Sequence, residues 1–330
     1  MRIAFFETKT WEQDYLSKRL KDFELAFYDT HKNVLDDKAE ILCVFIGLKI
    51  DAKVLGSFPN LKYICTRSTG FDHIDLEICA KKNILVSNIP TYGENTVAEF
   101  TFALLLALSR KIYPSIKRVK EEALFNCEAL QGVDLMGKTL GVIGTGHIGA
   151  YVVKIANGFG MHVIAFDPFP KAELAKQYNF DYVNMDELLS QSDIVTLHVP
   201  YTHETHHLLN KENFKKMKTG AMLINTARGG LVETEGLVWA LKTGVLSGAA
   251  MDVLEEEGFI KEEADLLVSG HQNEQQLKIL LADHVLMNMP NVIITPHNAF
   301  NSKEAITRIL DTTVSNIYSF QKNIPMNLVK

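Results

Sequence analysis

The chain has 330 residues, of which 47% are hydrophobic and 22% are charged, and its formal net charge is −6. This composition is typical of a globular protein, and the length suggests two domains rather than one. Because there is no surplus of basic residues to neutralise phosphate groups, the charge argues against nucleic acid and anionic membranes as partners.

No segment of the sequence has the features of a membrane span or of a secretory signal. The most apolar stretch, residues 97–108, contains Glu99 and is too short to cross a bilayer. The N-terminus begins directly with a strand-like run and lacks the layout of a signal peptide. We therefore expect a cytoplasmic protein with no membrane partner.

Short apolar runs alternate with amphipathic runs in the first third of the chain. The predicted strands are residues 3–6, 25–28, 42–46, 61–65 and 84–87. Helical patterns lie between them, for example from Trp11 to Leu20 and from Ile74 to Lys81. Strands that alternate with helices predict a parallel sheet with helices on both faces.

The segment from Glu94 to Leu108 is apolar on almost every face. A helix of this kind must be covered on all sides, so we expect it to lie between domains or against another subunit. The more polar residues 110–134 that follow are a candidate for an arm that crosses to that partner.

A second series of alternating strands and helices begins at Thr139. The predicted strands are residues 139–143, 162–166, 182–183, 194–199, 222–225, 248–253 and 292–295. This number of strands suits a complete doubly wound dinucleotide domain. Helices are clearest at residues 231–244 and 303–322. Residues 258–291 are irregular and predict an insertion or loop near the cleft, with a helical stretch around 275–281.

A glycine-rich motif, Gly144-Thr-Gly-His-Ile-Gly149, directly follows the first strand of this series and precedes a helical pattern. Gly144 would allow a tight turn, Gly146 would let backbone amides approach a pyrophosphate, and Gly149 would let the helix lie close to the strand. His147 and Ile148 begin that helix, whose N-terminus has N–H groups for the phosphates.

An acidic residue, Asp167, ends the next predicted strand, about 20 residues beyond the motif, where a dinucleotide site requires it. Its carboxylate can accept hydrogen bonds from the ribose hydroxyls and would repel a 2′-phosphate. The sequence therefore predicts NAD rather than NADP as the cofactor.

Polar residues gather at the ends of the later strands of the second series. Ligands of open parallel sheets bind beyond the carboxyl ends of the strands. The segments after these ends are His198–Pro200, Asn225–Gly229, Ala250–Val253 running into Glu255–Glu257, and Thr295–Asn298. An arginine, several acids and a histidine would thus reach the edge that holds the cofactor.

These side chains suit hydride transfer to the carbonyl carbon of an oxo acid. The carbonyl oxygen develops alkoxide character, so an acid must supply a proton, and a histidine kept protonated by a carboxylate can do so. A guanidinium group presents a rigid fork that matches the substrate carboxylate, which lysine cannot reproduce.

Several motifs occur together and in a characteristic order. They are Arg67–Asp75, Ile89–Glu99, Gly141–Gly149, His198–Tyr201, Asn225–Gly229, Ala250–Val253 and Thr295–His297. In these motifs the chain resembles the D-isomer-specific 2-hydroxyacid dehydrogenase family, in its D-lactate dehydrogenase branch. The resemblance implies reduction of a small 2-oxo acid, foremost pyruvate, by NADH to the D-2-hydroxy acid, or the reverse reaction.

The resemblance also implies an α/β architecture with two doubly wound parallel-sheet domains. A Rossmann NAD-binding domain, residues 99–296, would be inserted into a flavodoxin-like substrate domain made of residues 1–98 and 297–330. The family further implies a homodimer that forms through residues 97–108.

Specific residues receive roles through this resemblance. Arg228 would anchor the substrate carboxylate, His297 would be the acid/base, and Glu257 would pair with His297. The implied substrate-side residues are Thr69, Gly70 and Tyr92. The implied cofactor contacts are Gly144, Gly146, His147, Ile148, Gly149, Asp167, His198, Val199, Pro200, Thr205, Thr226, Ala227 and Asp252.

Two departures from the branch leave the preferred substrate open. Thr69 stands where the D-lactate branch commonly has valine, and Gly93-Glu94 replaces its usual Ser-Pro. Dehydrogenases for other 2-oxo acids, such as 2-oxoisocaproate, phenylpyruvate or hydroxypyruvate, are therefore alternatives. A protein of another class, an NAD-sensing corepressor-like binding protein, can share the same fold.

Four histidines lie close together in the sequence and superficially resemble a metal-binding cluster. They are His198, His203, His206 and His207. No acid is well placed among them, and the family reaction needs no metal. We assign them to loop or cofactor-lining positions and expect no metal site.

Overall fold

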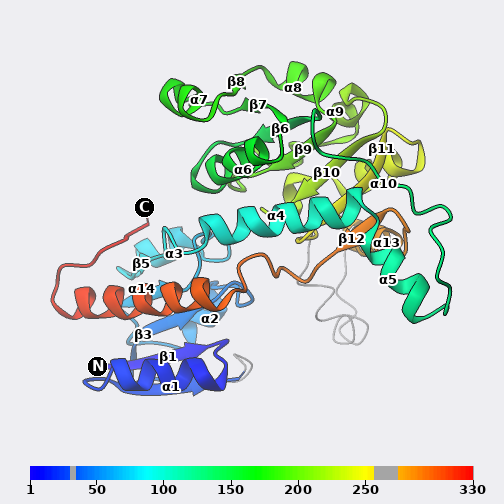
Figure 1. Cartoon of the computed structure of the whole chain (residues 1–330). Coiled ribbons are helices and arrows are strands. Elements are labelled where there is room, and N and C mark those ends of the chain that lie inside the picture. The colour runs from blue at the N-terminus through cyan, green and yellow to red at the C-terminus, as the bar shows by residue number, and fades with distance from the viewer. Residues whose placement is uncertain (30–34, 256–273, 330) are drawn as a thin grey trace. The chain divides into compact units, whose positions relative to one another are not determined.

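The computed structural model describes residues 1–29, 35–255 and 274–329. The chain divides into two compact units, one made of Met1–Tyr92 with Asn301–Lys330 and the other of Gly93–Phe300. Figure 1 traces the chain from the first unit through the second and back. The second unit is thus inserted into the first. The domain boundaries predicted after residues 98 and 296 lie a few residues inside the second unit.

The first unit contains a five-stranded sheet in the order β2-β1-β3-β4-β5. Its strands are β1 (Arg2–Phe6), β2 (Glu24–Tyr28), β3 (Ala39–Val44), β4 (Tyr63–Thr66) and β5 (Leu85–Ser87). Every neighbouring pair is parallel. This is the flavodoxin-like strand order. Its helices are α1 (Thr10–Arg19), α2 (Ala52–Gly56), α3 (Leu76–Lys81) and α14 (Lys303–Gln321).

The C-terminal helix α14 completes the first unit, although about 200 residues of the other unit precede it. The ring of Phe320 stacks on Tyr63 of β4 with 4.4 Å between centroids. Tyr15 of α1 donates a hydrogen bond to Asp311 of α14 at 2.6 Å. The first and last helices, blue and red in Figure 1, therefore belong to one folded unit.

The second unit contains a seven-stranded parallel sheet in the order β12-β11-β10-β9-β6-β7-β8. Its strands are β6 (Thr139–Ile143), β7 (His162–Phe166), β8 (Asp181–Tyr182), β9 (Ile194–Leu197), β10 (Ala221–Asn225), β11 (Leu246–Met251) and β12 (Val292–Ile294). The order reverses between β6 and β9, and such a switch point is where ligands of doubly wound sheets bind.

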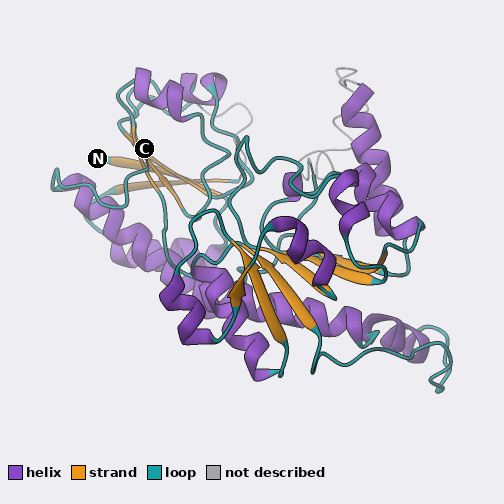
Figure 2. Cartoon of the chain, turned by 90° about the horizontal axis from the view of Figure 1, so that it is seen from above, coloured by secondary structure: helices purple, strands orange, loops and turns teal. Residues whose placement is uncertain are grey.

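Helices cover both faces of this sheet, whose strands are orange in Figure 2. They are α4 (Glu94–Ser109), α5 (Ile112–Lys120), α6 (His147–Gly158), α7 (Ala172–Tyr178), α8 (Met185–Gln191), α9 (Lys211–Lys216), the 3-10 helix η1 (Gly229–Leu231), α10 (Thr234–Lys242) and α13 (Glu274–Met287). Side chains of β10 alternate between two apolar cores, with Leu223 in one core and Met222 and Ile224 in the other. The near-continuous apolar runs of the sequence follow from this two-sided burial.

Each strand expected from the sequence is present, with ends displaced by at most three residues. Residues 258–291 were expected to form an insertion or loop with a helical stretch around 275–281, and this helix is present and longer than expected. Residues 274–287 form α13, and Leu286 of this helix is buried in the core. Residues 256–273 lie outside the described part of the chain.

The apolar helix α4 is a core element of its own unit. It packs on α6 and over β10, β11 and β12, and Phe102 stacks on Phe159 at 5.3 Å. Its cover on that side thus comes from the same unit, whereas Phe100 is half-buried and Ala103 is exposed. No helix in the described ranges is both long and apolar enough to cross a membrane.

Candidate active site

The glycine-rich loop joins β6 to α6 and has the geometry of a dinucleotide loop. Gly144 has a φ of +94°, and a Cβ atom there would lie 2.7 Å from the carbonyl oxygen of His198. A Cβ atom at Gly149 would lie 2.0 Å from the carbonyl oxygen of Gly144. At Gly146, the N-cap of α6, a Cβ atom would meet nothing within 4 Å. The loop is thus tightly packed at Gly144 and Gly149, and it leaves open space at Gly146 where a diphosphate can approach the N-terminus of α6.

The carboxylate of Asp167 lies directly beside this loop, at the end of β7. Its Oδ2 accepts hydrogen bonds from the backbone N–H of Thr145 at 2.8 Å and from the Thr145 hydroxyl at 2.9 Å. Its Oδ1 accepts the N–H of Phe169 at 2.9 Å. A fixed negative charge at this place suits a ribose with a free 2′-hydroxyl and opposes a 2′-phosphate. The loop and the acid therefore fit NAD.

The segment that carries Arg228 is shaped by a buried amide. Asn225 ends β10 and is fully buried. Its Nδ2 donates to the carbonyl oxygen of Arg228 at 2.8 Å, and its Oδ1 accepts the N–H of Ala227 at 3.0 Å. Thr226 exchanges a hydrogen bond with Thr101 of α4 at 2.9 Å, and both are buried. The turn after β10 is therefore held from within, and Arg228 leaves it in a defined direction.

Asp252 ties together the ends of three adjacent strands. Its N–H donates to the carbonyl oxygen of Asn225 at 2.8 Å, and its own carbonyl oxygen accepts the N–H of His297 at 2.8 Å. Its carboxylate, fully buried, accepts the N–H groups of Asn298 and Ala299 at 2.8 Å each, and also the Thr295 hydroxyl. Burial raises the pKa of Asp252, against the opposing effects of these hydrogen bonds and of His297.

His297 has a left-handed backbone, with a φ of +53°. This conformation is uncommon for a residue other than glycine, and it is maintained here by the two bonds that its N–H donates, to Asp252 and to the carbonyl oxygen of Thr295. Since β10 and β12 both border β11, Arg228 and His297 arise from strand ends on either side of Asp252. A residue with a guanidinium group and a residue with an imidazole group thereby lie at one edge of the sheet.

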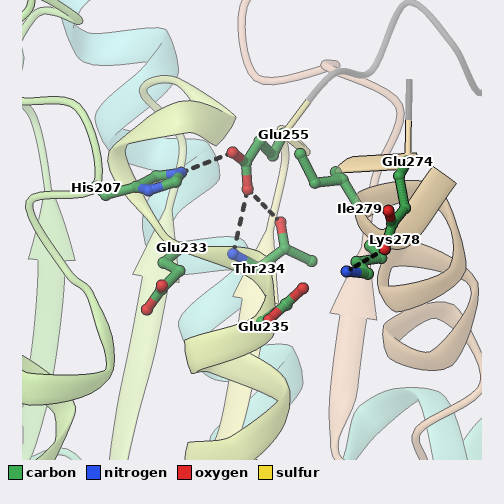
Figure 3. Close-up of a pocket in the computed structure, with 8 residues that line it drawn as sticks. All are labelled: His207, Glu233, Thr234, Glu235, Glu255, Glu274, Lys278 and Ile279. Atoms are coloured by element: carbon green, nitrogen blue, oxygen red, sulfur yellow. Dashed lines mark hydrogen bonds and ion pairs between the residues drawn. The ribbon is translucent and has the colours of Figure 1, made fainter. Parts of the chain in front are cut away.

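Glu255 is the centre of a second hydrogen-bonded cluster, three residues beyond Asp252 (Figure 3). Its Oε1 contacts Nε2 of His207 at 2.6 Å, and its Oε2 accepts the hydroxyl of Thr234 at 2.7 Å. The backbone N–H of His207 donates to the carbonyl oxygen of Gly230 at 2.9 Å. Glu255 is only 9% exposed. The carboxylate of Glu255 thus connects the loop of His207 to Thr234, the first residue of α10.

A cavity of about 370 Å³ adjoins this hydrogen-bonded cluster. Among the side chains that line it are Glu233, Glu235, Glu255 and Glu274 (Figure 3). Carboxylates repel an anionic oxo acid, so this cavity is a poor place for such a substrate. Close by, burial and the charge of Glu255 raise the pKa of Asp283 to about 8.

The residues expected on the substrate side all lie in the first unit. The Thr69 hydroxyl donates to the carbonyl oxygen of Ile89 at 2.8 Å, and Asn88 donates to the carbonyl oxygen of Thr69 at 2.7 Å. Gly70 accepts a hydrogen bond from Ser68 at 2.6 Å, and Tyr92 accepts one from Arg308 at its carbonyl oxygen. The structure therefore joins the segment of Thr69 and Gly70 to the segment that leads to Tyr92. Glu257 lies outside the described residues.

The segment His198–Thr205 lies against the glycine-rich loop. A Cβ atom at Gly144 would also lie 2.7 Å from Val199, and Thr205 closes the segment by donating to the carbonyl oxygen of Pro200 at 2.8 Å. Burial lowers the pKa of His198 to about 3, so its ring is neutral. Within residues 1–29, 35–255 and 274–329, no group of three histidine, cysteine or acidic side chains could hold a metal ion.

Some residues that shape the site received no role from the sequence. Thr145 and Glu255 act through hydrogen bonds to segments distant in the chain, whereas the side chain of Asn225 bonds to the turn that directly follows it. Glu255 is one of three adjacent glutamates, a pattern that suggests a solvated surface. A buried asparagine after an apolar strand was the one available signal, because a polar side chain in such a place must find internal partners.

The comparisons with known proteins agree with this geometry. Residues 102–299 match the model of a family described as "D-isomer specific 2-hydroxyacid dehydrogenase, NAD binding domain". The D-lactate dehydrogenase of Escherichia coli is 35% identical over 333 residues, which are 98% of this chain and 97% of that protein. A 2-hydroxyacid dehydrogenase homolog of Haemophilus influenzae is 37% identical over 332 residues, 97% of this chain and 96% of that one.

A crystal structure of a D-lactate dehydrogenase from Aquifex aeolicus, in complex with NAD and lactic acid, has a similar fold. Its TM-score is 0.84 and its sequence identity is 38%, over 98% of this chain and 96% of that one.

Two parallel-sheet α/β units and a glycine-rich loop with its acidic partner define an NAD-dependent oxidoreductase. The chain belongs to the D-isomer-specific 2-hydroxyacid dehydrogenase family. The family resemblance, the fold class and the cofactor expected from the sequence are thereby confirmed.

Proposed function

We propose that this dehydrogenase is a D-lactate dehydrogenase, which reduces pyruvate to D-lactate with NADH and catalyses the reverse reaction. The observation that carries the proposal is the link of Asn225, Asp252 and His297 through two 2.8 Å backbone hydrogen bonds, which brings Arg228 and His297 to one edge of the sheet. The relatives named D-lactate dehydrogenase support the substrate.

Arg228 is the proposed anchor for the substrate carboxylate. Its guanidinium group can form two parallel hydrogen bonds to a carboxylate, which fixes both the position and the plane of the oxo acid. The clasp of Asn225 around the turn keeps the Arg228 backbone from moving when the substrate binds. Less conformational freedom is then lost on binding.

His297 is the proposed acid/base. NADH, when bound, supplies the hydride to the carbonyl carbon. In that direction His297 donates a proton to the carbonyl oxygen, and in the reverse direction it accepts one from the hydroxyl group. Glu257 is proposed to pair with His297 and to keep the imidazole protonated for reduction, a role that rests on the family resemblance.

The proposed substrate-side residues are Thr69, Gly70 and Tyr92, and residues 1–98 with 297–330 form the proposed substrate domain. The Thr69 hydroxyl is engaged with the carbonyl oxygen of Ile89, so the remaining surface of this side chain is a methyl group. Thr69 therefore offers a ligand nearly the same apolar shape as the valine common in the D-lactate branch. This supports a substrate with a small apolar group, such as pyruvate.

The proposed NAD contacts are those expected from the sequence. They are Gly144, Gly146, His147, Ile148, Gly149, Asp167, His198, Val199, Pro200, Thr205, Thr226, Ala227 and Asp252. The tight loop, the open space over Gly146 and the carboxylate of Asp167 support the assignment. In the structure Asp252 also has a mechanical role, because its carboxylate holds the loop of His297.

We also propose that the chain forms a homodimer, for which α5 and the segment after it supply part of the interface. None of the side chains of α5 is buried. The exposed apolar residues of this region are Ile112, Tyr113, Ile116, Val119, Leu124 and Phe125. An apolar row of this length on a helix is typical of a surface covered by another chain.

The experiment that tests the function follows the loss of NADH absorbance with a panel of 2-oxo acids: pyruvate, 2-oxobutyrate, 2-oxoisocaproate, phenylpyruvate, oxaloacetate and hydroxypyruvate. We expect the highest kcat/KM with pyruvate, and oxidation of D-lactate but not of L-lactate. A preference for a bulkier acid would keep the mechanism and replace the substrate. No turnover with any acid, despite NADH binding, would favour the corepressor-like alternative.

A further inference from the structure

The carboxylate of Asp167 is connected to a third side chain through Thr145. The Thr145 hydroxyl contacts both Oδ2 of Asp167, at 2.9 Å, and the hydroxyl of Tyr182, at 2.8 Å. Thr145 is only 2% exposed, so water has little access to this chain of contacts. Tyr182 lies 15 residues beyond Asp167 and on a different strand, β8.

The direction of these hydrogen bonds follows from the chemistry of the groups. An ionised carboxylate can only accept, so the single proton of the Thr145 hydroxyl is donated to Asp167. The Thr145 oxygen must then accept the proton of the Tyr182 hydroxyl. The two bonds point the same way, toward the carboxylate, and such a chain strengthens each member.

The position of Tyr182 is itself fixed. Its backbone pairs with Ala165 of β7, two residues before Asp167. Its ring packs edge-on against Phe180, with 5.0 Å between centroids, and Phe180 is buried. The Tyr182 hydroxyl is therefore a rigid donor placed by the sheet.

The acceptor sites of Asp167 are almost filled. Oδ2 accepts two hydrogen bonds from Thr145, and Oδ1 accepts one from Phe169. A carboxylate oxygen has about two acceptor positions, so one position remains on Oδ1 for a ligand hydroxyl. In the described part of the chain no cation forms an ion pair with this carboxylate.

We propose that Tyr182 and Thr145 are positioning residues for cofactor selection, which hold the Asp167 carboxylate in the orientation that accepts NADH and rejects NADPH. The inference rests on the proposed contact of Asp167 with the ribose. A 2′-phosphate can be accommodated only if the carboxylate turns away. Turning breaks the hydrogen bonds from Thr145 to the carboxylate. The bond from Tyr182 strengthens them, so it raises the free energy that NADPH binding would cost.

The test measures the dissociation constants of NADH and NADPH for the full chain, from the fluorescence of the reduced nicotinamide and without any oxo acid. The quantity compared is the ratio of the NADPH constant to the NADH constant. We expect Tyr182→Phe to lower this ratio about three- to tenfold, because this factor corresponds to the free energy of one lost hydrogen bond. Thr145→Val should lower it at least as much, and Thr145→Ser should keep it.

Tyr178→Phe is the matched control. Tyr178 is half-buried in the same unit, and its hydroxyl has no hydrogen-bond partner among the described residues. Its removal should leave the ratio unchanged. In the Asp167→Ala background, Tyr182→Phe should have no further effect on the ratio, because the group that it positions is gone.

The possible failures are distinguishable. If Asp167→Ala leaves the ratio of wild type, the proposed cofactor role of Asp167 is wrong, and the inference falls with it. If Asp167→Ala lowers the ratio but neither Tyr182→Phe nor Thr145→Val does, only the positioning inference is wrong. The positioning inference would also be overturned if Tyr182→Phe raised the dissociation constants of NADH and NADPH by the same factor. An effect of Tyr182→Phe on the ratio that persists in the Asp167→Ala background would overturn it as well.

Discussion

At the scale of single residues, His297 shows how backbone and chemistry are connected. Its left-handed conformation depends on the bonds to Asp252 and Thr295, so a substitution that cannot adopt a positive φ would change the loop as well as the imidazole. Asparagine tolerates this conformation better than alanine. His297→Asn is therefore the more informative variant for testing the acid/base assignment.

We expect His297→Asn to lower kcat for pyruvate reduction by about a hundredfold to ten-thousandfold, the usual contribution of a general acid. The dissociation constant of NADH should change little, because the ring is not a proposed cofactor contact. Steady-state kinetics and NADH fluorescence titration measure the two effects. His203→Asn, at an exposed position, is the control. Near-normal kcat across pH would refute the assignment.

Arg228→Lys tests whether the geometry of the guanidinium group matters beyond its charge. We expect kcat/KM for pyruvate to fall by about tenfold to a hundredfold, with a higher KM and a lower kcat, since lysine cannot form the two parallel hydrogen bonds. The same change at the exposed Arg110 should have no effect. An unchanged KM in the Arg228 variant would exclude it as the carboxylate anchor.

Asp283 gives a pH dependence of stability. Neither of its carboxyl oxygens has a hydrogen-bond partner among the described residues, and burial raises its pKa to about 8. The group is neutral in the folded chain up to about pH 8, whereas in the unfolded chain it ionises near pH 4. Its contribution to stability is therefore intact below about pH 4 and is lost as the pH rises to about 8.

Asp283→Asn removes this titration and keeps the shape of the side chain. We expect the variant to be more stable than wild type at pH 8, by on the order of 3 kcal/mol, and the difference to shrink as the pH approaches 4. The midpoints of thermal unfolding at several pH values measure the effect. Asp181→Asn, at an exposed position, should show no such trend. A gap that stays constant with pH would contradict the expected titration.

At the scale of secondary structure elements, α5 differs from the other long helices of its unit because it has no buried side chain. Helices in water are stabilised mainly by packing of an apolar face, and α5 has such a face without a cover from its own unit. A second copy of the chain is the proposed cover.

The double variant Ile116→Asp, Val119→Asp should convert the proposed dimer to a monomer, because the charges would be buried without partners. Sedimentation velocity at several protein concentrations measures the change. Lys117→Asp, on the same helix but outside the apolar row, is the control and should remain dimeric. A dimer that survives the double variant would place the interface elsewhere.

At the scale of the whole molecule, the chain divides the proposed cofactor and acid/base residues from the proposed substrate-side residues, because one unit is inserted into the other. The glycine-rich loop, Asp167, Arg228 and His297 all lie in Gly93–Phe300, and the proposed residues Thr69 and Gly70 lie in the other unit. The inserted unit has its own sheet and its own two apolar cores.

A protein made of residues 93–300 alone should therefore fold and bind NADH, but it should not reduce pyruvate. Circular dichroism, NADH fluorescence and the absorbance assay measure these three properties. The full chain is the reference for the binding constant. A folded fragment without affinity for NADH would show that the other unit contributes to the cofactor site, and turnover by the fragment would contradict the proposed substrate domain.

Much of the fold could be predicted because its signals are local. Buried parallel strands such as β6 and β10 are short apolar runs, and the glycine-rich loop is a contiguous motif with a fixed geometry. In the segment 258–291 the sequence indicated a helix only around 275–281, whereas α13 extends over 274–287. Its apolar residues lie around most of its circumference, so the helical period is weak.

The sequence by itself determined the two α/β series, the cofactor, the family and the order in which the candidate residues appear. These depend on local periodicity and on contiguous motifs. Only the tertiary structure decided that Asp252 binds three strand ends together, that Glu255 is buried against His207 and Thr234, and that Tyr182 reaches Asp167 through Thr145. Hydrogen bonds between residues distant in the chain leave no period or motif, because they depend on how strands are ordered in the sheet.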